Sequence, residues 1–232
     1  MSPRPKRTTQ VRNLQEAIKE TAWKQIAEFG AAALALRAIA RELKITAPAI
    51  YNYFPNRDAL VTALIVDAFA SLADAQLESL TAIPEQDHAE RLRALGCAYH
   101  SWAVAYPERY QLIFGTPIAG YIAPEEITMP VAARSLAILV GVLQSAHAVG
   151  KLRTDAAYEM SPQLKAMIGT WQQARGPADE QVLFLALVIW GQVHGLVSAE
   201  IGHQFPPFIT DADEVYFHAL ELLIAQYIPD AI

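Results

Sequence analysis

Apolar residues recur every three or four positions along most of this chain, the spacing that places them on one side of an α-helix. The first such stretch covers residues 12–29, "RNLQEAIKETAWKQIAEF". Polar and charged residues fill the positions between, so the helix should have one buried and one solvated face. Gly30 follows at once and is a typical residue to end it. The pattern predicts an amphipathic helix that contributes this apolar side to a core: Leu14, Ile18, Ala22, Ile26 and Phe29.

Two shorter helices are expected next, over residues 36–43 and from Thr46 to Pro55. Thr46 is a favourable N-cap, and Pro48 lies in the first turn, where its missing N–H costs little. A long helix should then run over about 57–80. Beyond it, Pro and Gly separate more apolar segments, and helices are expected at about 85–105, 107–114, 130–149, 156–174, 178–202 and 211–228.

Strand signals are nearly missing from the sequence, since few Val, Ile and Thr runs alternate and neither Asn-Gly nor Asp-Gly occurs. The sequence therefore predicts an all-α fold. A three-helix head, residues 1–60, should be joined through the long helix at about 57–80 to a larger helical body, residues 81–232.

Composition supports a folded, intracellular protein. Hydrophobic residues make up 53% and charged residues 18% of the 232 positions, enough apolar material for a sizeable core. The single cysteine, Cys97, excludes an internal disulfide, and the basic start "MSPRPKRTTQ" has no apolar signal segment after it. We expect a reduced, cytoplasmic setting.

One segment needs a comparison with membrane spans. Residues 182–199 are 18 uncharged positions, at the lower limit for crossing a bilayer. Polar Gln192, His194 and Ser198 crowd its second half, so a buried helix of a soluble protein is expected, and no membrane partner.

Charge is distributed unevenly along the chain. Residues 1–60 contain ten lysines and arginines against five acidic residues, although the whole chain has a net charge of −6. A basic head on an acidic protein is consistent with a head that meets a polyanion. A solvated basic face would have the same composition, so the asymmetry supports other evidence only.

The two short helices and the "ELKIT" turn between them have the arrangement of a helix-turn-helix. Ile39, Ala40 and Ile50 are spaced to form its small core, together with Leu43 and Ile45. Small residues at the start of the third helix would let it enter a DNA major groove about 12 Å wide and contact thymine methyls. Tyrosine, threonine and arginine side chains would hold phosphates. The candidate DNA contacts are Arg37, Thr46, Ala47, Pro48, Ala49, Tyr51, Asn52, Tyr53 and Arg57. Tyr51 and Tyr53 could instead be the edge of a core, and Phe54 is expected to pack near Leu60.

Residues 8–60 resemble the DNA-binding head of the TetR/AcrR family of transcriptional regulators. The resemblance lies in "AWKQIAEFGAAALALRAIARELKITAPAIYNYFPNRDAL", above all in A-I-A followed by Y-N-Y-F-x-N-R-x-A-L. The resemblance implies that these residues occupy positions that touch DNA in the family: Arg37, Thr46, Ala47, Pro48, Tyr51, Tyr53 and Arg57. Asn52 is the weakest such assignment, and Ala49 is not implied by the resemblance. Lys44 stands where the family usually has glycine, so a left-handed lysine costing about 1 kcal/mol is expected. Arg4, Lys6 and Arg7 could form a minor-groove arm or a disordered basic tail.

The body is similar, over the shorter stretches "YPERYQLIF" and "WGQVHG", to the C-terminal domain type named for a Trp-His-Gly signature. That resemblance implies a small-molecule effector site and a two-fold dimer. Recurring aromatic and lone polar residues give a candidate pocket, with an ordinary core as the alternative for each of them: His100, Trp102, Tyr106, Tyr110, Phe114, Tyr121, His147 and Trp171. Two largely apolar helices give a candidate dimer interface: Leu183, Leu187, Trp190, His194, Val197, Leu220, Leu223, Ile224 and Tyr227.

The sequence contains no set of residues typical of an enzyme. Cys97 and His100 could share a helix face, but no further metal ligand follows at a usual spacing, and Gly-rich phosphate loops, G-x-S-x-G and H-E-x-x-H are missing. No cofactor or metal is expected. The sequence predicts a sequence-specific transcriptional regulator, a homodimeric repressor released from a palindromic operator by a small apolar or aromatic effector. The alternative is a helical protein-interaction module with a degenerate DNA-binding head.

Overall fold

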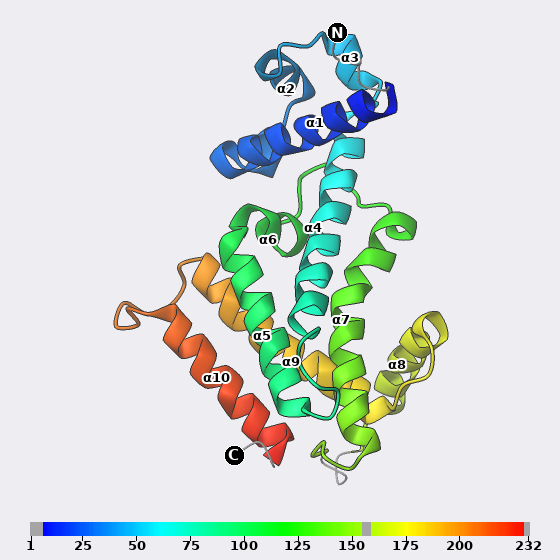
Figure 1. Ribbon diagram of the computed structural model, residues 1–232, viewed down its shortest axis with the longest axis vertical. Helices are drawn as coiled ribbons and strands as arrows, with labels where there is room; N and C mark the ends of the chain where they lie inside the picture. The colour runs from blue at the N-terminus through cyan, green and yellow to red at the C-terminus, as the bar shows by residue number, and fades with distance from the viewer. Residues whose placement is uncertain (1–6, 155–158, 230–232) are drawn as a thin grey trace. The chain divides into compact units, whose positions relative to one another are not determined.

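A computed structural model of the chain describes residues 7–154 and 159–229, and every regular element in those ranges is a helix (Figure 1). This confirms the all-α fold. The elements are α1 (Arg7–Phe29), the short 3-10 helix η1 (Ala31–Ala33), α2 (Leu36–Glu42), α3 (Ala47–Tyr51), α4 (Arg57–Ser79), α5 (His88–Ala105), α6 (Pro107–Phe114), α7 (Glu125–Ala148), α8 (Pro162–Arg175), α9 (Glu180–Ile201) and α10 (Ala212–Tyr227).

The helices divide between two compact units, and α4 and α7 each contribute to both. The first unit extends through Phe69 and takes in Tyr106–Val131. The second comprises Ala70–Ala105 and the chain from Ala132 onward. We assigned α6 to the body from sequence, whereas its contacts place it with the head helices.

The first unit is organised around α1. Helices α2 and α6 pack against it, and α3 packs against α2. Of the expected core residues, Ile39, Ala40 and Ile50 are buried, together with Ile18 of α1. Leu43 and Ile45 are only half-buried, and Phe29 at the end of α1 is 63% exposed, so these parts of the prediction are corrected. Phe54 and Leu60 are buried as well, as the sequence predicted for the start of α4. Apolar burial of this kind is the main term that stabilises so small a head.

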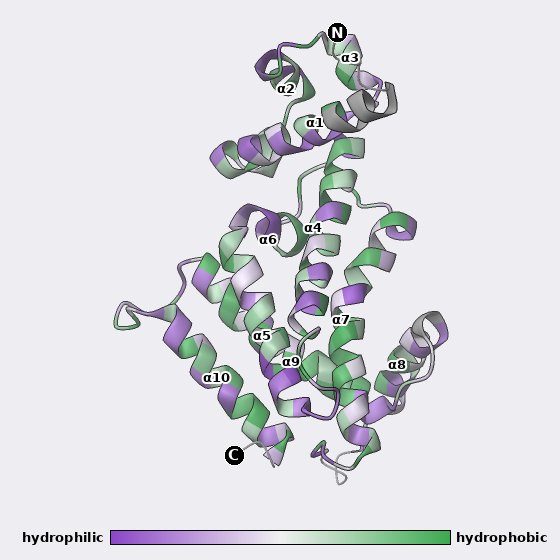
Figure 2. Ribbon diagram, viewed as in Figure 1, coloured by the Kyte–Doolittle hydropathy of each residue, from purple (hydrophilic) through white to green (hydrophobic). Residues whose placement is uncertain are grey.

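The second unit contains a close-packed group of α5, α9 and α10, with α8 against α9. Gly96 of α5 permits the close approach of α10, because a Cβ at this position would lie only 2.6 Å from Cδ1 of Leu220. The phenol of Tyr216, which is fully buried, donates a hydrogen bond to the Gly96 carbonyl at 2.7 Å. Much of α7 and α9 is apolar, whereas much of α1 is polar (Figure 2).

The beginning of α7 differs from the sequence prediction. A helix starting at Pro130 was expected, but α7 begins at Glu125 and contains Pro130 inside it. Glu125 and Glu126 lie in its first turn, where acidic side chains interact favourably with the positive end of the helix dipole. Pro130 therefore lies only one turn inside the helix, where losing one backbone N–H is tolerated more easily than at the centre.

Candidate nucleic-acid interface

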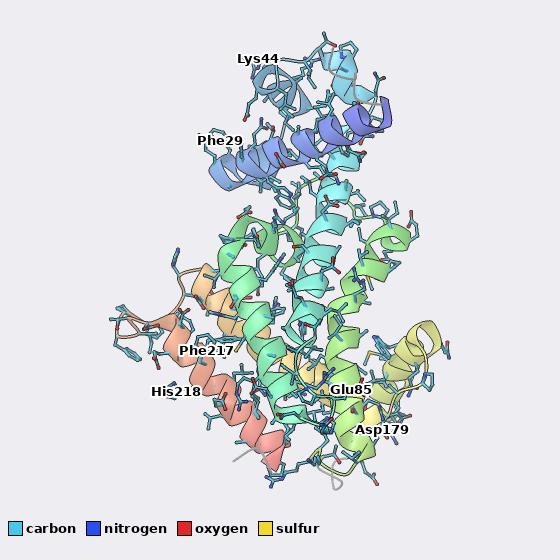
Figure 3. The ribbon with its side chains drawn as sticks, in the orientation of Figure 1. Phe29, Lys44, Glu85, Asp179, Phe217 and His218 are labelled. Carbon is cyan, nitrogen blue, oxygen red and sulfur yellow. The ribbon has the colours of Figure 1, made fainter. Side chains whose placement is uncertain are left out.

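The turn between α2 and α3 is closed by a Schellman motif. The Lys44 amide donates to the Arg41 carbonyl at 3.1 Å, and the Ile45 amide donates to the Ala40 carbonyl at 3.0 Å. Lys44 itself has a φ of 55°, in the left-handed region that glycine usually occupies. The left-handed lysine expected from the sequence is confirmed, and its side chain is exposed at the turn (Figure 3).

Helix α3 has one buried residue, Ile50, and its other residues are exposed or half-buried. Thr46 is its N-cap, is exposed, and makes no capping hydrogen bond with its own side chain, so its hydroxyl remains available to a ligand. Tyr51 is 42% exposed. The predicted DNA contacts in and beside α3 are here called the α3 surface, of which Thr46, Pro48, Tyr51 and Asn52 are exposed and Ala47, Ala49 and Tyr53 are half-buried. The possibility that Tyr51 is a core residue is excluded by its exposure.

Arg37 is exposed on α2, which packs against α3, so it lies on the same small module as the α3 surface. Three further basic residues of the first unit are also exposed, namely Lys24, Arg41 and Lys44. Exposed cations around a protruding helix are the usual electrostatic feature of a surface that binds a polyanion.

Arg57 has a role that the sequence did not predict. Its Nε donates to the Leu34 carbonyl at 3.1 Å, and its Nη2 donates to the carbonyls of Ala31 at 2.9 Å and Ala32 at 3.2 Å. These bonds attach the start of α4 to the loop after α1. We expected the guanidinium to hold a DNA phosphate, but most of its donors are engaged within the protein, and a phosphate contact stays a prediction for the remaining ones.

The predicted basic arm cannot be placed. Arg4 and Lys6 lie outside the described residues, and the side chain of Arg7, the first residue of α1, is likewise outside the described part.

Comparisons with known proteins agree with this geometry. The family model described as "Bacterial regulatory proteins, tetR family" matches residues 18–64, and that of "Tetracyclin repressor-like, C-terminal domain" matches residues 92–223. The HTH-type transcriptional regulator Rv1816 of Mycobacterium tuberculosis (strain ATCC 25618 / H37Rv) is 31% identical over 213 residues, which are 91% of each chain. The chain belongs to the TetR family. It is a transcriptional regulator with a DNA-binding domain and not an enzyme.

Solved structures of TetR-type proteins superpose on most of the chain. The crystal structure of the protein SCO4313 is 34% identical, with a TM-score of 0.77 over 94% of this chain and 98% of that one. A complex of SmeT with triclosan shares the fold, with a TM-score of 0.65, 16% identity and coverage of 92% and 91%. The similarity to the Trp-His-Gly domain type is not tested by these matches and stays a prediction.

Three helices of this TetR-family chain, α4, α7 and α9, are long and apolar enough to cross a membrane by length and composition alone. The sequence had drawn attention only to α9. Each of these helices also contributes residues that are buried within the chain: Leu64 and Leu72 in α4, Leu143 in α7, Ile189 and Val197 in α9.

The predicted effector residues are divided between the two units. Tyr106, Tyr110 and Phe114, with Tyr121, belong to the first unit, whereas His100, Trp102, His147 and Trp171 belong to the second. Several of them are engaged in local contacts. Trp102 donates to Ser71 at 3.0 Å, and Tyr121 shares a 2.8 Å hydrogen bond with Thr62. A pocket lined by this set stays a prediction.

The second unit does contain a cavity that the sequence did not indicate. Its volume is about 200 Å³, and its lining is mostly apolar with a few polar groups: Arg153, Thr154, Met160, Gln181, Phe184, Leu185, Val188 and Tyr227. Only Tyr227 had been singled out from the sequence, as a dimer residue. The lining residues are distant along the chain, from the α7–α8 connection to the end of α10, and no single helix pattern could have revealed them.

The predicted dimer interface must be corrected in part. Leu183, Val197, Leu220, Leu223 and Ile224 are buried within the chain itself, each 5% exposed or less. They form the core between α9 and its neighbours and leave no surface for a partner. Apolar residues spaced three or four positions apart identify one side of a helix, and on α9 and α10 that side faces the core of the same chain. The exposed apolar residues on these helices are Leu187, Phe217 and Leu222, at 41%, 39% and 72%.

Two groups of interacting side chains were not predicted from the sequence. The guanidinium of Arg109 on α6 lies 5.3 Å from the ring centre of Trp23 on α1 and 4.3 Å from that of Tyr106. The Tyr99 hydroxyl lies 2.9 Å from Nδ1 of His194, and the His194 ring stacks on Trp190. Burial lowers the pKa of His194, so the neutral imidazole is favoured.

Cys97 is half-buried, and burial raises the pKa of its thiol. A raised pKa disfavours the thiolate, which is the nucleophilic and metal-binding form. The reactive Cys97–His100 pair considered from sequence is therefore disfavoured, in agreement with the family assignment.

Proposed function

We propose that this regulator is a homodimeric repressor that binds a palindromic operator through two α3 surfaces and leaves it when a small effector binds the second unit. The observation that carries the proposal is the α3 surface, where Thr46, Pro48, Tyr51 and Asn52 are exposed beside a single buried residue, Ile50. A helix of this length contributes little to the core, so its exposed side chains are the better explanation of its role. Such a surface suits insertion into the major groove.

Two-fold dimers are supported by the unpartnered apolar residues of α9 and α10. Leu187, Gly191 and Gly195 lie at intervals of four along α9 and are all exposed, and neither glycine has an atom within 4 Å of an added Cβ. A stripe of this kind lets a second helix approach closely. Together with exposed Leu222 on α10 it suits a four-helix interface between two copies.

The effector is proposed to be small and largely apolar. The cavity of about 200 Å³ in the second unit has apolar walls formed by Phe184, Leu185 and Val188, and polar groups on Arg153 and Gln181. This composition is typical of small-molecule sites, in which a few polar groups orient an apolar ligand. The structurally related SmeT is described in complex with triclosan. The effector must bind this cavity more tightly at one spacing of the two DNA-binding heads than at another. The coupling free energy between effector binding and DNA binding is typically about 1–3 kcal/mol. Action on DNA implies a cytoplasmic location.

Fluorescence anisotropy with duplexes from the DNA upstream of the coding region tests the proposal. At fixed salt and with excess nonspecific competitor, a sequence-specific repressor retains tight binding to one palindrome. Moving the half-sites apart by half a helical turn should abolish it, because two heads read sites about 34–36 Å apart. Asn52→Glu on the α3 surface should weaken binding strongly, while Gln163→Glu on exposed α8 serves as a control with the same charge change.

The alternative, an interaction module with a degenerate head, predicts that binding disappears when competitor is added and that Asn52→Glu and Gln163→Glu behave alike. Binding of that kind across the upstream duplexes would overturn the repressor proposal.

A further inference from the structure

Three helices of the second unit bring a histidine and two carboxylates together. His100 lies on α5, Glu200 in the last turn of α9 and Asp213 in the first turn of α10. His100 Nε2 is 2.8 Å from Glu200 Oε2 and 3.5 Å from Asp213 Oδ1, and the three atoms all lie within 4.8 Å of one another. Residues so far apart in sequence meet here because α5, α9 and α10 pack as one group.

The imidazole is held in a fixed orientation. The His100 side chain is only 4% exposed and its ring stacks on Tyr216, with ring centres 4.2 Å apart. Phe217 contacts it in an edge arrangement at 5.4 Å, and Tyr216 is itself anchored by its hydrogen bond to the Gly96 carbonyl. A ring packed on two sides leaves Nε2 directed at the two carboxylates, which is the preorganisation that a metal ligand requires.

The charges around this nitrogen call for a cation. Nε2 carries at most one proton, which can point at only one of the two carboxylates, so two carboxylates converge on one donor. Glu200 also lies at the C-terminal end of α9, where the helix dipole disfavours a negative side chain and no basic residue lies in the last turn. A divalent ion bound between the three atoms would neutralise both carboxylates and relieve this end of the helix.

We propose that His100, Glu200 and Asp213 bind one divalent transition-metal ion of the Zn²⁺ class. With bonds of about 2.1 Å, neighbouring ligand atoms of a tetrahedral site lie about 3.4 Å apart. The observed separations from Nε2, 2.8 Å and 3.5 Å, fall on either side of that value, and the two carboxylate oxygens lie within 4.8 Å of each other, so side-chain adjustments of about an ångström would complete the site. The nitrogen donor selects against Mg²⁺ and Ca²⁺, which prefer all-oxygen sites. Asp213 is 61% exposed, which leaves an open side for ion entry and for a water as fourth ligand.

Such an ion would join α5 to the connection between α9 and α10. That connection begins with a second Schellman motif, in which His203, at a φ of 52°, donates its amide to the Glu200 carbonyl at 2.9 Å. The motif fixes the backbone of Glu200, and the Asp211 side chain caps the start of α10 by accepting from the Glu214 amide at 3.2 Å. Both carboxylate ligands are therefore presented by ordered helix ends. This proposal is independent of the effector and operator proposals above.

The test uses the full chain without a polyhistidine tag, stripped of metal with a chelator. Calorimetric titration with Zn²⁺ should give one site per chain, Co²⁺ should produce the visible absorption of a tetrahedral complex, and Zn²⁺ should raise the melting temperature. Mg²⁺ at the same concentration should neither give a calorimetric binding site nor raise the melting temperature. Asp213→Asn, at an exposed position that leaves the fold intact, should weaken Zn²⁺ binding at least about tenfold. His100→Gln should abolish it.

His218→Gln is the matched control, because His218 and Glu214 form an exposed pair on the same helix with 3.4 Å between their atoms (Figure 3). Unchanged Zn²⁺ affinity in this variant supports the buried site. Zn²⁺ binding that survives Asp213→Asn undiminished, or that is lost in His218→Gln instead, would overturn the proposal. So would a wild-type chain that binds no Zn²⁺ or Co²⁺, because the three groups would then only hold α5, α9 and α10 together.

Discussion

Nη2 of Arg57 donates a hydrogen bond to the carbonyl oxygen of Ala31 at 2.9 Å, and so joins the first residue of α4 to the loop that follows α1. We expect Arg57→Ala to destabilise the protein by about 1–3 kcal/mol, because partly buried carbonyls lose a charged donor. Urea unfolding measures the change. Arg37→Ala, at an exposed arginine, should leave stability within about 0.5 kcal/mol and lower DNA affinity instead. If both variants were equally stable, the Arg57 hydrogen bonds would be energetically unimportant.

Tyr51→Phe separates a phosphate contact from packing. Tyr51 is exposed on the α3 surface, so removing its hydroxyl should leave thermal stability unchanged. If the hydroxyl holds a phosphate, affinity should fall by about tenfold on operator and nonspecific DNA alike, as expected for one hydrogen bond to a charged group. Anisotropy titrations on both duplexes at the same salt check this. An unchanged affinity would assign Tyr51 to van der Waals contact or to no contact.

Arg109 should stabilise the packing of α6 on α1. Its guanidinium lies against the rings of Trp23 and Tyr106, and cation–π contacts of this kind contribute about 0.5–2 kcal/mol. Arg109→Ala should lower the urea midpoint accordingly, and Arg109→Lys should recover only part of the loss because an ammonium does not stack in the same way. Lys24→Ala, at an exposed cation on α1, is the control. A full recovery with lysine would argue for charge alone.

His194 should make stability depend on pH. Burial lowers the pKa of its imidazole in the folded state, so the unfolded chain binds the additional proton as pH falls below the ordinary value of 6.5. Its contribution is therefore fully present above pH 6.5 and is lost on acidification until the folded-state pKa is reached. His194→Asn keeps an acceptor for the Tyr99 hydroxyl and should show a smaller loss of melting temperature in this window. His218→Gln, at an exposed histidine, should follow the wild type.

Two adjacent leucines on α10 distinguish the proposed interface from the core. Leu222 is 72% exposed and Leu223 is 5% exposed. Leu222→Glu should give folded monomers at concentrations where the wild type is dimeric, as measured by analytical ultracentrifugation. Leu223→Ala should instead destabilise the fold by about 2–5 kcal/mol by leaving a cavity. A fully dimeric Leu222→Glu protein would mean that the partner is bound elsewhere.

The DNA-binding head could be predicted from sequence in considerable detail because its signals are local. Thr46, Pro48 and Pro55 mark the limits of α3, and the spacing of Ile39, Ala40 and Ile50 defines the inner side of the module. Even the left-handed backbone of Lys44 could be inferred, since the turn geometry demands it whichever residue occupies the position.

The body was less predictable because its sites depend on contacts between distant segments. Helix periodicity identified an apolar side of α10 correctly but could not say that Leu220 and Ile224 face α5 rather than a second chain. Likewise, His100 is a lone histidine in the sequence, and only packing brings Glu200 and Asp213 to it. The internal hydrogen bonds of Arg57 could not be predicted for the same reason, since the carbonyls it binds lie more than twenty residues earlier.

The close contact of Gly96 with Leu220 has an evolutionary consequence. Because an added Cβ would lie 2.6 Å from the leucine, a mutation to alanine at 96 is tolerated only after position 220 has become smaller or α10 has moved outward. The two sites should therefore change together among relatives, in a preferred order with the leucine first. Tyr216 must keep its hydroxyl near the Gly96 carbonyl throughout, which further restricts the routes by which this pair of helices can diverge.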